Sequence, residues 1–326
     1  MFDHHTHEHP QRLQRWLEGQ PASSTDTQLV DIVVAGRETP NQPIAGQGII
    51  FVPEGFKPDS AFVGQRQVVE YWGELATTDA EIGLGRHVAV AIESYSTIGY
   101  MQLASAAAIS ITDQADVHAL HQDAEIAMAE GRFPTHLLNS HITLIDLQAW
   151  LRRNHRDQVQ RILVRPDGSM TAGLTGEDIS PESLQWPDEC RILPPDIDQM
   201  PDEELRPVQR YLGAIRAIQL MSIHQTSTWW VSGFAWQAFG LDDNNLGPSD
   251  PYLLRDAANT YWLVDPGSTR GGKVSAAVAE AVYAYAIGVT PSTSCLETLG
   301  LARLTDADAV TLYTRLGLRV PQSTTI

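Results

Sequence analysis

The chain has 326 residues, of which 43% are hydrophobic and 19% are charged, a composition that excludes wholesale disorder and leaves room for two domains. Its formal net charge of −18 at pH 7 argues against general nucleic-acid binding and is compatible with a basic peptide partner. The sequence has no apolar run of membrane-spanning length, no signal-peptide pattern and only two cysteines, so we expect a cytoplasmic protein without membrane contact or a disulfide framework.

Residues 1–27 are expected to form a flexible N-terminus with one short helix. The helix is predicted because Leu13, Trp16 and Leu17 are spaced as on one helical face. A histidine cluster precedes it and comprises His4, His5, His7 and His9. Imidazoles bind metal ions, but a flexible terminus does not hold ligands in a fixed geometry. We therefore expect no metal site here.

Residues 28–180 are predicted to form a β-rich α+β domain. Short apolar runs that end at Gly or Pro predict strands, and their rapid succession predicts a mostly antiparallel sheet. These runs are residues 29–36, 48–55, 61–64, 88–94, 99–104 and 107–111. Helical spacing of apolar residues then predicts a helix over residues 114–133.

One pair of side chains in this domain allows an enzymatic alternative. His118 and His121 are three residues apart on the predicted helix, with Asp116 and Asp123 nearby, and two imidazoles with a carboxylate can bind a metal ion. A solvated helix face explains the same pattern, and no metalloprotease-type motif accompanies it.

Motifs for common cofactors and nucleophiles are absent. The chain has no phosphate-binding glycine loop, no dinucleotide fingerprint and no G-x-S-x-G elbow. Cys190 is surrounded by carboxylates, which oppose formation of a reactive thiolate. We expect no cofactor and assign no catalytic residue.

Two segments separate this domain from the C-terminal part. Residues 181–204 are rich in Pro and acidic side chains, which is typical of a linker. Residues 205–245 read as a helix followed by an aromatic strand segment. We interpret the aromatic cluster of that segment as core rather than as a binding surface. It comprises Trp229, Trp230, Phe234, Trp236 and Phe239.

Residues 246–326 are predicted to form a compact module of three short strands followed by three helices. The strands are expected around residues 252–255, 261–264 and 273–274. Ser275 is placed to cap the first helix, and Thr305 begins the signal for the third. This order of elements is that of a winged helix.

Separated segments of this module carry a pattern that we compare with a known family. The segments are L-L-R-D, Y-W-L-V-D-P, K-V-S-A and A-E-A-V, and together they resemble the PqqD-like precursor-recognition element. That element occurs in the biosynthesis of ribosomally made, post-translationally modified peptides. Residues 50–55, 99–116 and 121–149 extend the likeness, since they resemble the recognition proteins of daptide-type clusters.

The resemblance implies a binding site for the leader segment of a precursor peptide. Such elements bind the leader as an added strand at the edge of their third strand, next to their third helix. Carried onto this chain, the edge comprises Gly271, Gly272, Lys273, Val274 and Ser275. The groove wall comprises Asp306, Ala309, Val310, Tyr313 and Thr314.

From the resemblance we expect a non-catalytic accessory protein that presents the bound precursor to modifying enzymes of the same pathway. These enzymes would be an oxidative decarboxylase, an aminotransferase and a methyltransferase. Two alternatives stay open: the metal-dependent enzyme described above and a winged-helix transcriptional regulator. The regulator is disfavoured because Arg315 is the one basic side chain of the third predicted helix.

Overall fold

A computed structural model of the chain describes residues 8–20, 29–37, 47–75, 79–84, 88–98, 106–151, 161–179, 200–222, 228–241, 246–265 and 270–318. The chain divides into two compact units. Unit 1 comprises Met1–Ala119 and His141–Met200, and unit 2 comprises Leu120–Ser140 and Pro201–Ile326. Most of the expected linker, up to residue 199, lies outside the described residues, as do His4, His5, His7 and Cys190.

Unit 1 is built on strands with short helices between them. Its elements are α1 (Glu8–Leu17), β1 (Asp31–Val34), β2 (Ile49–Pro53), α2 (Ser60–Val63), β3 (Gln67–Gly73), β4 (Ala80–Leu84), β5 (Val88–Ser94), α3 (Tyr95–Ile98), β6 (Ala106–Ser110), β7 (Ile142–Leu144), α5 (Leu147–Leu151), β8 (Arg161–Val164), β9 (Met170–Ala172) and β10 (Asp178–Ile179). Helix α4 (Gln114–Glu130) begins in unit 1 and ends in unit 2.

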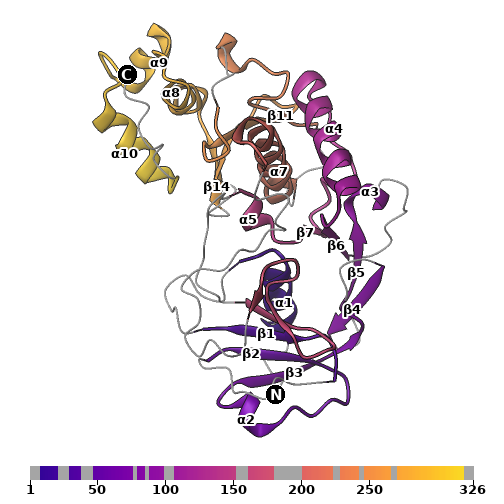
Figure 1. Cartoon of the computed structure of the whole chain (residues 1–326). Helices are drawn as coiled ribbons and strands as arrows, with labels where there is room; N and C mark the ends of the chain where they lie inside the picture. Colours follow the sequence, from indigo (N-terminus) through magenta and orange to yellow (C-terminus); the bar gives the residue numbers. More distant parts are fainter. Residues whose placement is uncertain are drawn as a thin grey trace. The chain divides into compact units, whose positions relative to one another are not determined.

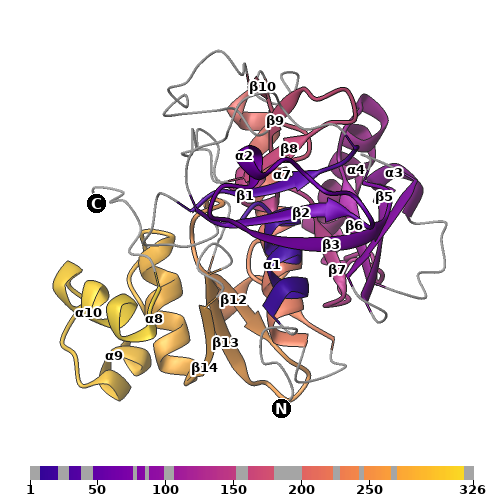
Figure 2. The same ribbon diagram turned by 90° about the horizontal axis from the view of Figure 1, so that it is seen from below.

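The described strands of unit 1 form one mixed sheet in the order β10-β9-β8-β1-β2-β3-β4-β5-β6-β7; Figure 1 labels β1 to β7, and Figure 2 labels β8, β9 and β10. The neighbours from β8 to β3 and from β5 to β7 are parallel, whereas β10-β9-β8 and β3-β4-β5 are antiparallel. The predicted α+β class is confirmed. Among the described strands of unit 1, four neighbouring pairs are antiparallel, as expected, and five are parallel, which the sequence analysis does not predict.

The central strands are buried on both faces. Val33 and Phe51 belong to the apolar cluster that contains Trp16 of α1. Their neighbours Ile32 and Ile50 belong to the opposite cluster, because successive side chains of a strand point to opposite faces. Continuous apolar runs are the usual signature of such strands. The predicted short N-terminal helix is confirmed as α1, and it covers one face of the sheet.

The strand expected at residues 61–64 is instead the short helix α2. The Asp59 carboxylate accepts a hydrogen bond from the Ala61 backbone N–H at 2.8 Å, which caps the first turn. Gly64, with φ of 57°, ends the helix after one turn. A local cap therefore outweighs the apolar pattern. The strand expected at residues 99–104 lies outside the described residues.

Unit 2 contains the second sheet and most of the longer helices. Its elements are α7 (Asp202–Ser222), β11 (Trp230–Val231), the 3-10 helix η2 (Ala238–Gly240), β12 (Tyr252–Arg255), β13 (Tyr261–Asp265), β14 (Arg270–Val274), α8 (Ala276–Ala286), α9 (Thr293–Leu299) and α10 (Asp306–Leu316).

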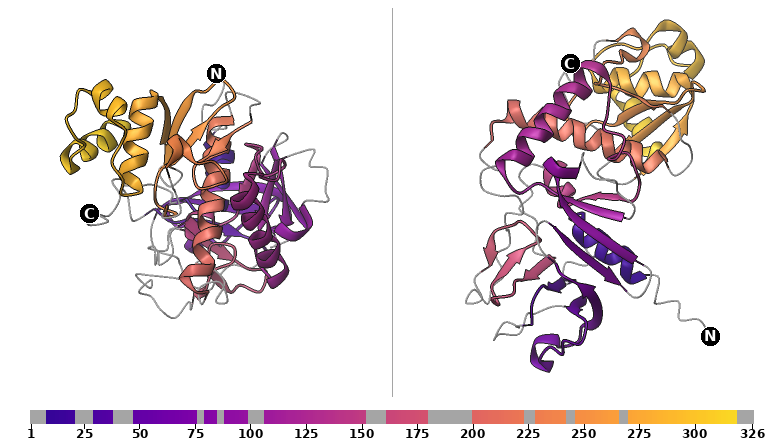
Figure 3. Two further views of the ribbon diagram at one scale, coloured as in Figure 1. Left: turned by 90° about the horizontal axis from the view of Figure 1, so that it is seen from above. Right: turned by 90° about the vertical axis from the view of Figure 1, so that its right-hand side faces the viewer.

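The four described strands of unit 2 are antiparallel neighbours in the order β11-β12-β13-β14. Helix α7 packs against β12 and β14, and α8 packs against β13 and α10 (Figure 2). Helices α8, α9 and α10 form one group beside the sheet (Figure 3). The predicted order of three strands and three helices is present, with β11 and α7 added from residues 205–245.

Close packing fixes α7 against the sheet. The Tyr252 hydroxyl donates to the Arg210 carbonyl at 2.9 Å, and the Arg210 guanidinium lies 3.8 Å from the Tyr252 ring centroid. Gly213 makes this approach possible, because a Cβ there would lie 2.1 Å from the Tyr252 hydroxyl. Among the described residues, no helix is both long and apolar enough to span a membrane.

Candidate functional site

Strand β14 is one edge of the unit 2 sheet in the described structure. It pairs with β13 on one side, from Asp265 opposite Arg270 to Tyr261 opposite Val274. The residues from Arg270 to Lys273 are exposed and Val274 is half-buried. Alternate residues of an edge strand direct their backbone N–H and C=O groups away from the sheet. This edge therefore presents backbone hydrogen-bonding groups to an incoming chain.

Helix α10 provides the second wall of the site, and its start is well defined. The Thr305 hydroxyl accepts from the Asp308 backbone N–H at 3.2 Å, and the Asp308 carboxylate accepts from the Thr305 backbone N–H at 3.0 Å. This reciprocal pair is a capping box. At the other end Gly317 has φ of 67°, which closes the helix.

A hollow of about 550 Å³ lies between β14 and the C-terminal half of α10. Its walls combine backbone, apolar and cationic groups. The lining residues are Leu263, Arg270, Gly271, Gly272, Thr314, Arg315, Leu316 and Gly317. The volume is in the range of small-ligand clefts, and one wall is an open strand edge.

The two glycines of β14 have different environments. A Cβ at Gly271 would lie 3.0 Å from Val264 Cγ2 and 3.1 Å from Met221 Cε of α7. A Cβ at Gly272 would meet nothing within 4 Å. Gly272 pairs with Leu263, which belongs to the apolar cluster shared with α8 and α10. The absence of a side chain at Gly272 therefore keeps the hollow open.

Arginines stand on both walls of the hollow. Arg270 comes from β14 and Arg315 from the last turn of α10, and both are exposed. The position of a Cβ at Gly317 is 3.3 Å from Arg270 Nη1, so the Arg270 side chain lies against the end of α10. Neither guanidinium forms an ion pair with a residue in the described part of the chain.

The structure brings together only part of the predicted site. Gly271, Gly272 and Thr314 line the hollow, while Lys273 and Val274 continue the same edge. Ser275 is the N-cap of α8, and its hydroxyl accepts from the Val278 N–H at 3.3 Å.

The predicted groove wall needs a correction at four of its five positions, because only Thr314 lines the hollow. Ala309 and Tyr313 are buried, and the Tyr313 hydroxyl donates to the Val282 carbonyl at 3.1 Å. These side chains hold α10 against α8 and are not presented to a ligand. Val310 is 43% exposed but does not line the hollow. Asp306 lies next to Tyr285, whose pKa is raised by burial and by the Asp306 carboxylate.

The sequence analysis does not predict five of the eight residues that line the hollow, which are Leu263, Arg270, Arg315, Leu316 and Gly317. The sequence predicts the third strand at residues 273–274, whereas β14 begins at Arg270. The start of this strand is hard to locate in the sequence, because the glycines at 271 and 272 have low strand propensity. Which face of α10 opens onto the hollow depends on packing, which periodicity alone does not give.

The residues of the enzymatic alternative have other roles. Asp116 is fully buried and accepts hydrogen bonds from Ser94 and from the backbone N–H groups of Ser96 and Thr112. Burial raises the pKa of Asp116, but these hydrogen bonds outweigh it and the pKa is lowered. His118 is exposed and His121 is half-buried. No group of three potential metal ligands occurs among the residues that the structure describes.

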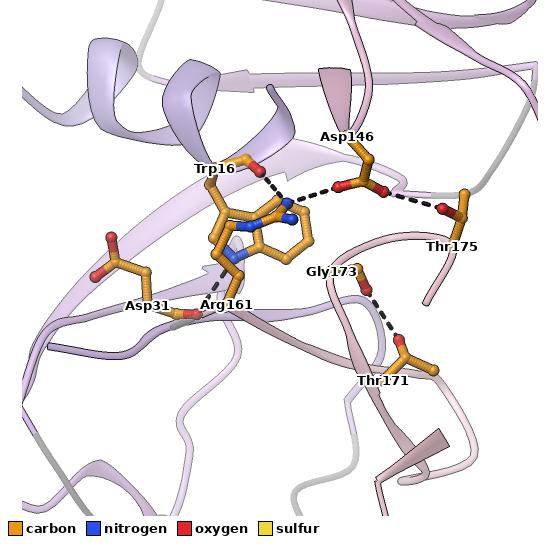
Figure 4. Close-up of polar contacts among 7 residues, drawn as sticks. All are labelled: Trp16, Asp31, Asp146, Arg161, Thr171, Gly173 and Thr175. Atoms are coloured by element: carbon orange, nitrogen blue, oxygen red, sulfur yellow. Dashed lines mark hydrogen bonds and ion pairs between the residues drawn. The ribbon is translucent and has the colours of Figure 1, made fainter. Parts of the chain in front are cut away.

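A second polar cluster in unit 1 has a structural explanation (Figure 4). The buried Arg161 donates from Nη1 to the Asp146 carboxylate and to the Trp16 carbonyl, both at 2.7 Å. Thr175 donates to the other Asp146 oxygen at 3.0 Å. These bonds join α1, β8 and the segments after β7 and β9. Nη2 of Arg161 is buried without a hydrogen-bond partner among the described residues. Because the Arg161–Asp146 ion pair is buried and ties separate segments together, we assign it no catalytic role.

The aromatic cluster near β11 is divided between core and surface. Phe234 is buried, whereas Trp230 is 36% exposed. The Arg255 guanidinium carbon lies 4.6 Å from the Trp230 ring centroid and 5.0 Å from that of Trp236. The core interpretation is confirmed for Phe234. It does not hold for Trp230, whose ring covers the Arg255 side chain at the β11 edge.

A comparison of the chain with protein-family models, with curated proteins and with solved structures found no significant match.

Proposed function

We propose that unit 2 binds an extended peptide by strand addition to β14, with the peptide's side chains seated in the hollow beside α10. The observation that carries this proposal is the hollow of about 550 Å³ between an exposed strand edge and a helix. A peptide strand would pair with the open backbone groups of the edge. Its inward side chains would then meet Leu263 and Leu316.

An extended peptide suits the site better than a compact small molecule. The edge presents its backbone groups in a row with the repeat of a β-strand, and a second strand is the ligand that satisfies such a row. Each backbone hydrogen bond contributes about 0.5–1.5 kcal/mol net. The backbone would thus supply affinity independent of sequence, and the hollow would select the side chains.

The biological role that we propose is recognition of the leader of a ribosomally made precursor peptide. The order of three antiparallel strands and three helices supports it, because that order matches the resemblance to PqqD-like elements. In this role the protein is a non-catalytic accessory factor that presents the precursor to modifying enzymes of its pathway. A cytoplasmic location, where precursor peptides are translated, is part of the same proposal.

The test is a selection of short random peptides displayed on their own mRNA, with the full chain as bait. The same selection is run with Gly272→Leu, which fills the hollow, and with Ala302→Leu as the control. Ala302 is exposed and does not line the hollow. Gly272→Leu is expected to fold, because the position of its Cβ is free of neighbours, and thermal unfolding checks this.

We expect the wild-type chain and Ala302→Leu to enrich the same peptides. For labelled copies of those peptides, fluorescence anisotropy should show binding at least about tenfold weaker to Gly272→Leu, which corresponds to about 1.4 kcal/mol. No enrichment by the wild-type chain, or equal binding by a folded Gly272→Leu, would rule the proposal out.

A further inference from the structure

The charge of the hollow is opposite to that of the whole molecule. The chain carries −18, yet Arg270 and Arg315 line the hollow and Lys273 lies on the same strand edge. The acidic residues Asp306 and Asp308 are at the other end of α10, about 10 Å or more from Arg315 by helical rise. Asp265 is opposite Arg270 on β13, but its side chain is buried and forms no ion pair with Arg270. The hollow therefore has a local positive potential at the C-terminal end of α10.

The surroundings of the two arginines in the described structure offset at most part of their charge. Arg315 is in the last turn of α10, where a cation is favoured by the helix dipole. Arg270 lies against Gly317 at the same helix end. Two guanidinium groups facing one hollow repel each other unless an anion lies between them. No carboxylate of the described residues forms an ion pair with either group.

We propose that the peptide bound at β14 carries an Asp or Glu side chain that binds between Arg270 and Arg315. This inference rests on the proposed function and specifies its ligand as an acidic peptide strand. A guanidinium binds a carboxylate through two parallel hydrogen bonds, so the pair fixes the position of that side chain. Because a shift by one residue along a strand moves every side chain to the other face, this contact also sets the register of the peptide.

The overall charge of the chain favours a basic peptide, whereas the local charge of the hollow favours an acidic side chain at one position of that peptide. Long-range repulsion from a chain of −18 slows the approach of an acidic ligand. A carboxylate that has reached the hollow is in direct contact with two cations and is screened less by salt. The ligand is therefore expected to have one acidic position at the hollow and no overall acidic bias.

The experiment uses the peptides selected on the wild-type chain. We expect one position of the aligned peptides to be enriched in Asp or Glu. Anisotropy titrations then measure Arg270→Gln, Arg315→Gln and, as the control, Arg303→Gln, which is exposed and outside the hollow. Each of the first two variants should bind about three- to tenfold more weakly, and the control should be unchanged.

Charge reversal separates a direct contact from a change in helix stability. A peptide whose acidic residue is replaced by Lys should bind Arg315→Glu more tightly than it binds the wild-type chain, because the charges are again opposite. A general weakening of α10 would reduce the binding of both peptides. If Arg315→Glu binds both the acidic peptide and its Lys variant more weakly than the wild-type chain does, the proposed contact is overturned.

Failure of this inference is distinguishable from failure of the proposed function. Selected peptides could depend on Gly272, show no acidic position and bind Arg270→Gln and Arg315→Gln as tightly as the wild-type chain. That result would overturn the acidic side chain and leave the proposed peptide binding in place. If no selected peptide depends on Gly272, both are overturned.

Discussion

Asp116 is a candidate metal ligand in the sequence, but in the structure its carboxylate accepts hydrogen bonds from the backbone. Its two oxygens accept from Ser96 and Thr112 N–H groups and from Ser94, at the start of α4. Hydrogen bonds of this kind favour the ionised form, so they lower the pKa of Asp116 although burial raises it. At the residue scale it holds the segments after β5 and β6 together.

Asp116→Asn is predicted to lower the free energy of unfolding by about 2–3 kcal/mol at pH 7, because buried donors lose an ionised acceptor. A depressed pKa stabilises the fold above the unfolded pKa of about 3.9, and this contribution is lost as the pH falls through the folded pKa. The difference between wild type and variant should therefore shrink below about pH 4. Urea unfolding at several pH values measures it.

Asp59→Asn is the matched control, since Asn caps a helix as well as Asp does and α2 should keep its cap. Its effect is expected to be below about 0.5 kcal/mol. A pH-independent effect of Asp116→Asn would contradict the assigned role of the carboxylate.

Gly272 gives a second prediction at the residue scale. Gly272→Ala should raise the free energy of unfolding by about 0.5–1 kcal/mol, because glycine is unfavourable inside a strand and the added Cβ meets no neighbour. The same substitution should weaken the binding of selected peptides. Gly271→Ala provides the contrast, since its Cβ would press on Val264 and Met221. A destabilised Gly272→Ala would show that the position is not open.

At the scale of elements, α10 is the wall on which the site depends. Its buried side chains Ala309 and Tyr313 face α8, and its C-terminal half faces the hollow. The capping box at Thr305 fixes where the helix begins and hence which residues face each way. A helix of 11 residues is short enough for one cap to matter.

Thr305→Ala is expected to lower the free energy of unfolding by about 1 kcal/mol, since it removes the acceptor for the Asp308 N–H. The control is Thr298→Ala in α9, where the exposed hydroxyl donates to the Ser294 carbonyl within the helix. That change should lie within about 0.5 kcal/mol. Denaturant unfolding compares the two, and equal effects would contradict a specific role for the cap.

The local elements of this site could be read from the sequence, and their mutual placement could not. The order of strands and helices in unit 2 follows from turn residues and caps such as Ser275 and Thr305. β14 begins three residues before the expected third strand, because Gly271 and Gly272 carry no strand signal. Arg270 and Arg315 are 45 positions apart in the sequence, so only tertiary packing joins them in one hollow.

In unit 1 the strands could be predicted from the sequence, but the way in which they pair could not. The runs around β1, β2 and β6 were predictable from their apolar residues, but their parallel pairing depends on which strands become neighbours. Parallel neighbours require long crossover connections, and a run of short strands does not reveal them. At residues 61–64 the Asp59 cap decided for a helix against the apolar pattern.

At the scale of the whole molecule, the net charge of −18 favours peptide recognition over the alternative of a DNA-binding winged-helix regulator. A DNA-binding module releases counterions with its Lys and Arg side chains, so its affinity falls steeply with salt. The described basic residues at the hollow are few and lie beside a strand edge. We predict no measurable binding of duplex DNA at low or physiological salt in anisotropy titrations. Specific binding that weakens with added salt would contradict this.

The most direct measurement of the central claim is hydrogen–deuterium exchange of the full chain with and without a selected peptide. Strand addition predicts slower exchange of the amides of β14, together with protection of the C-terminal half of α10. The amides of β11, at the opposite edge of the sheet, serve as the internal reference and should not change. Protection at β11 or in unit 1, with β14 unaffected, would contradict strand addition at this edge.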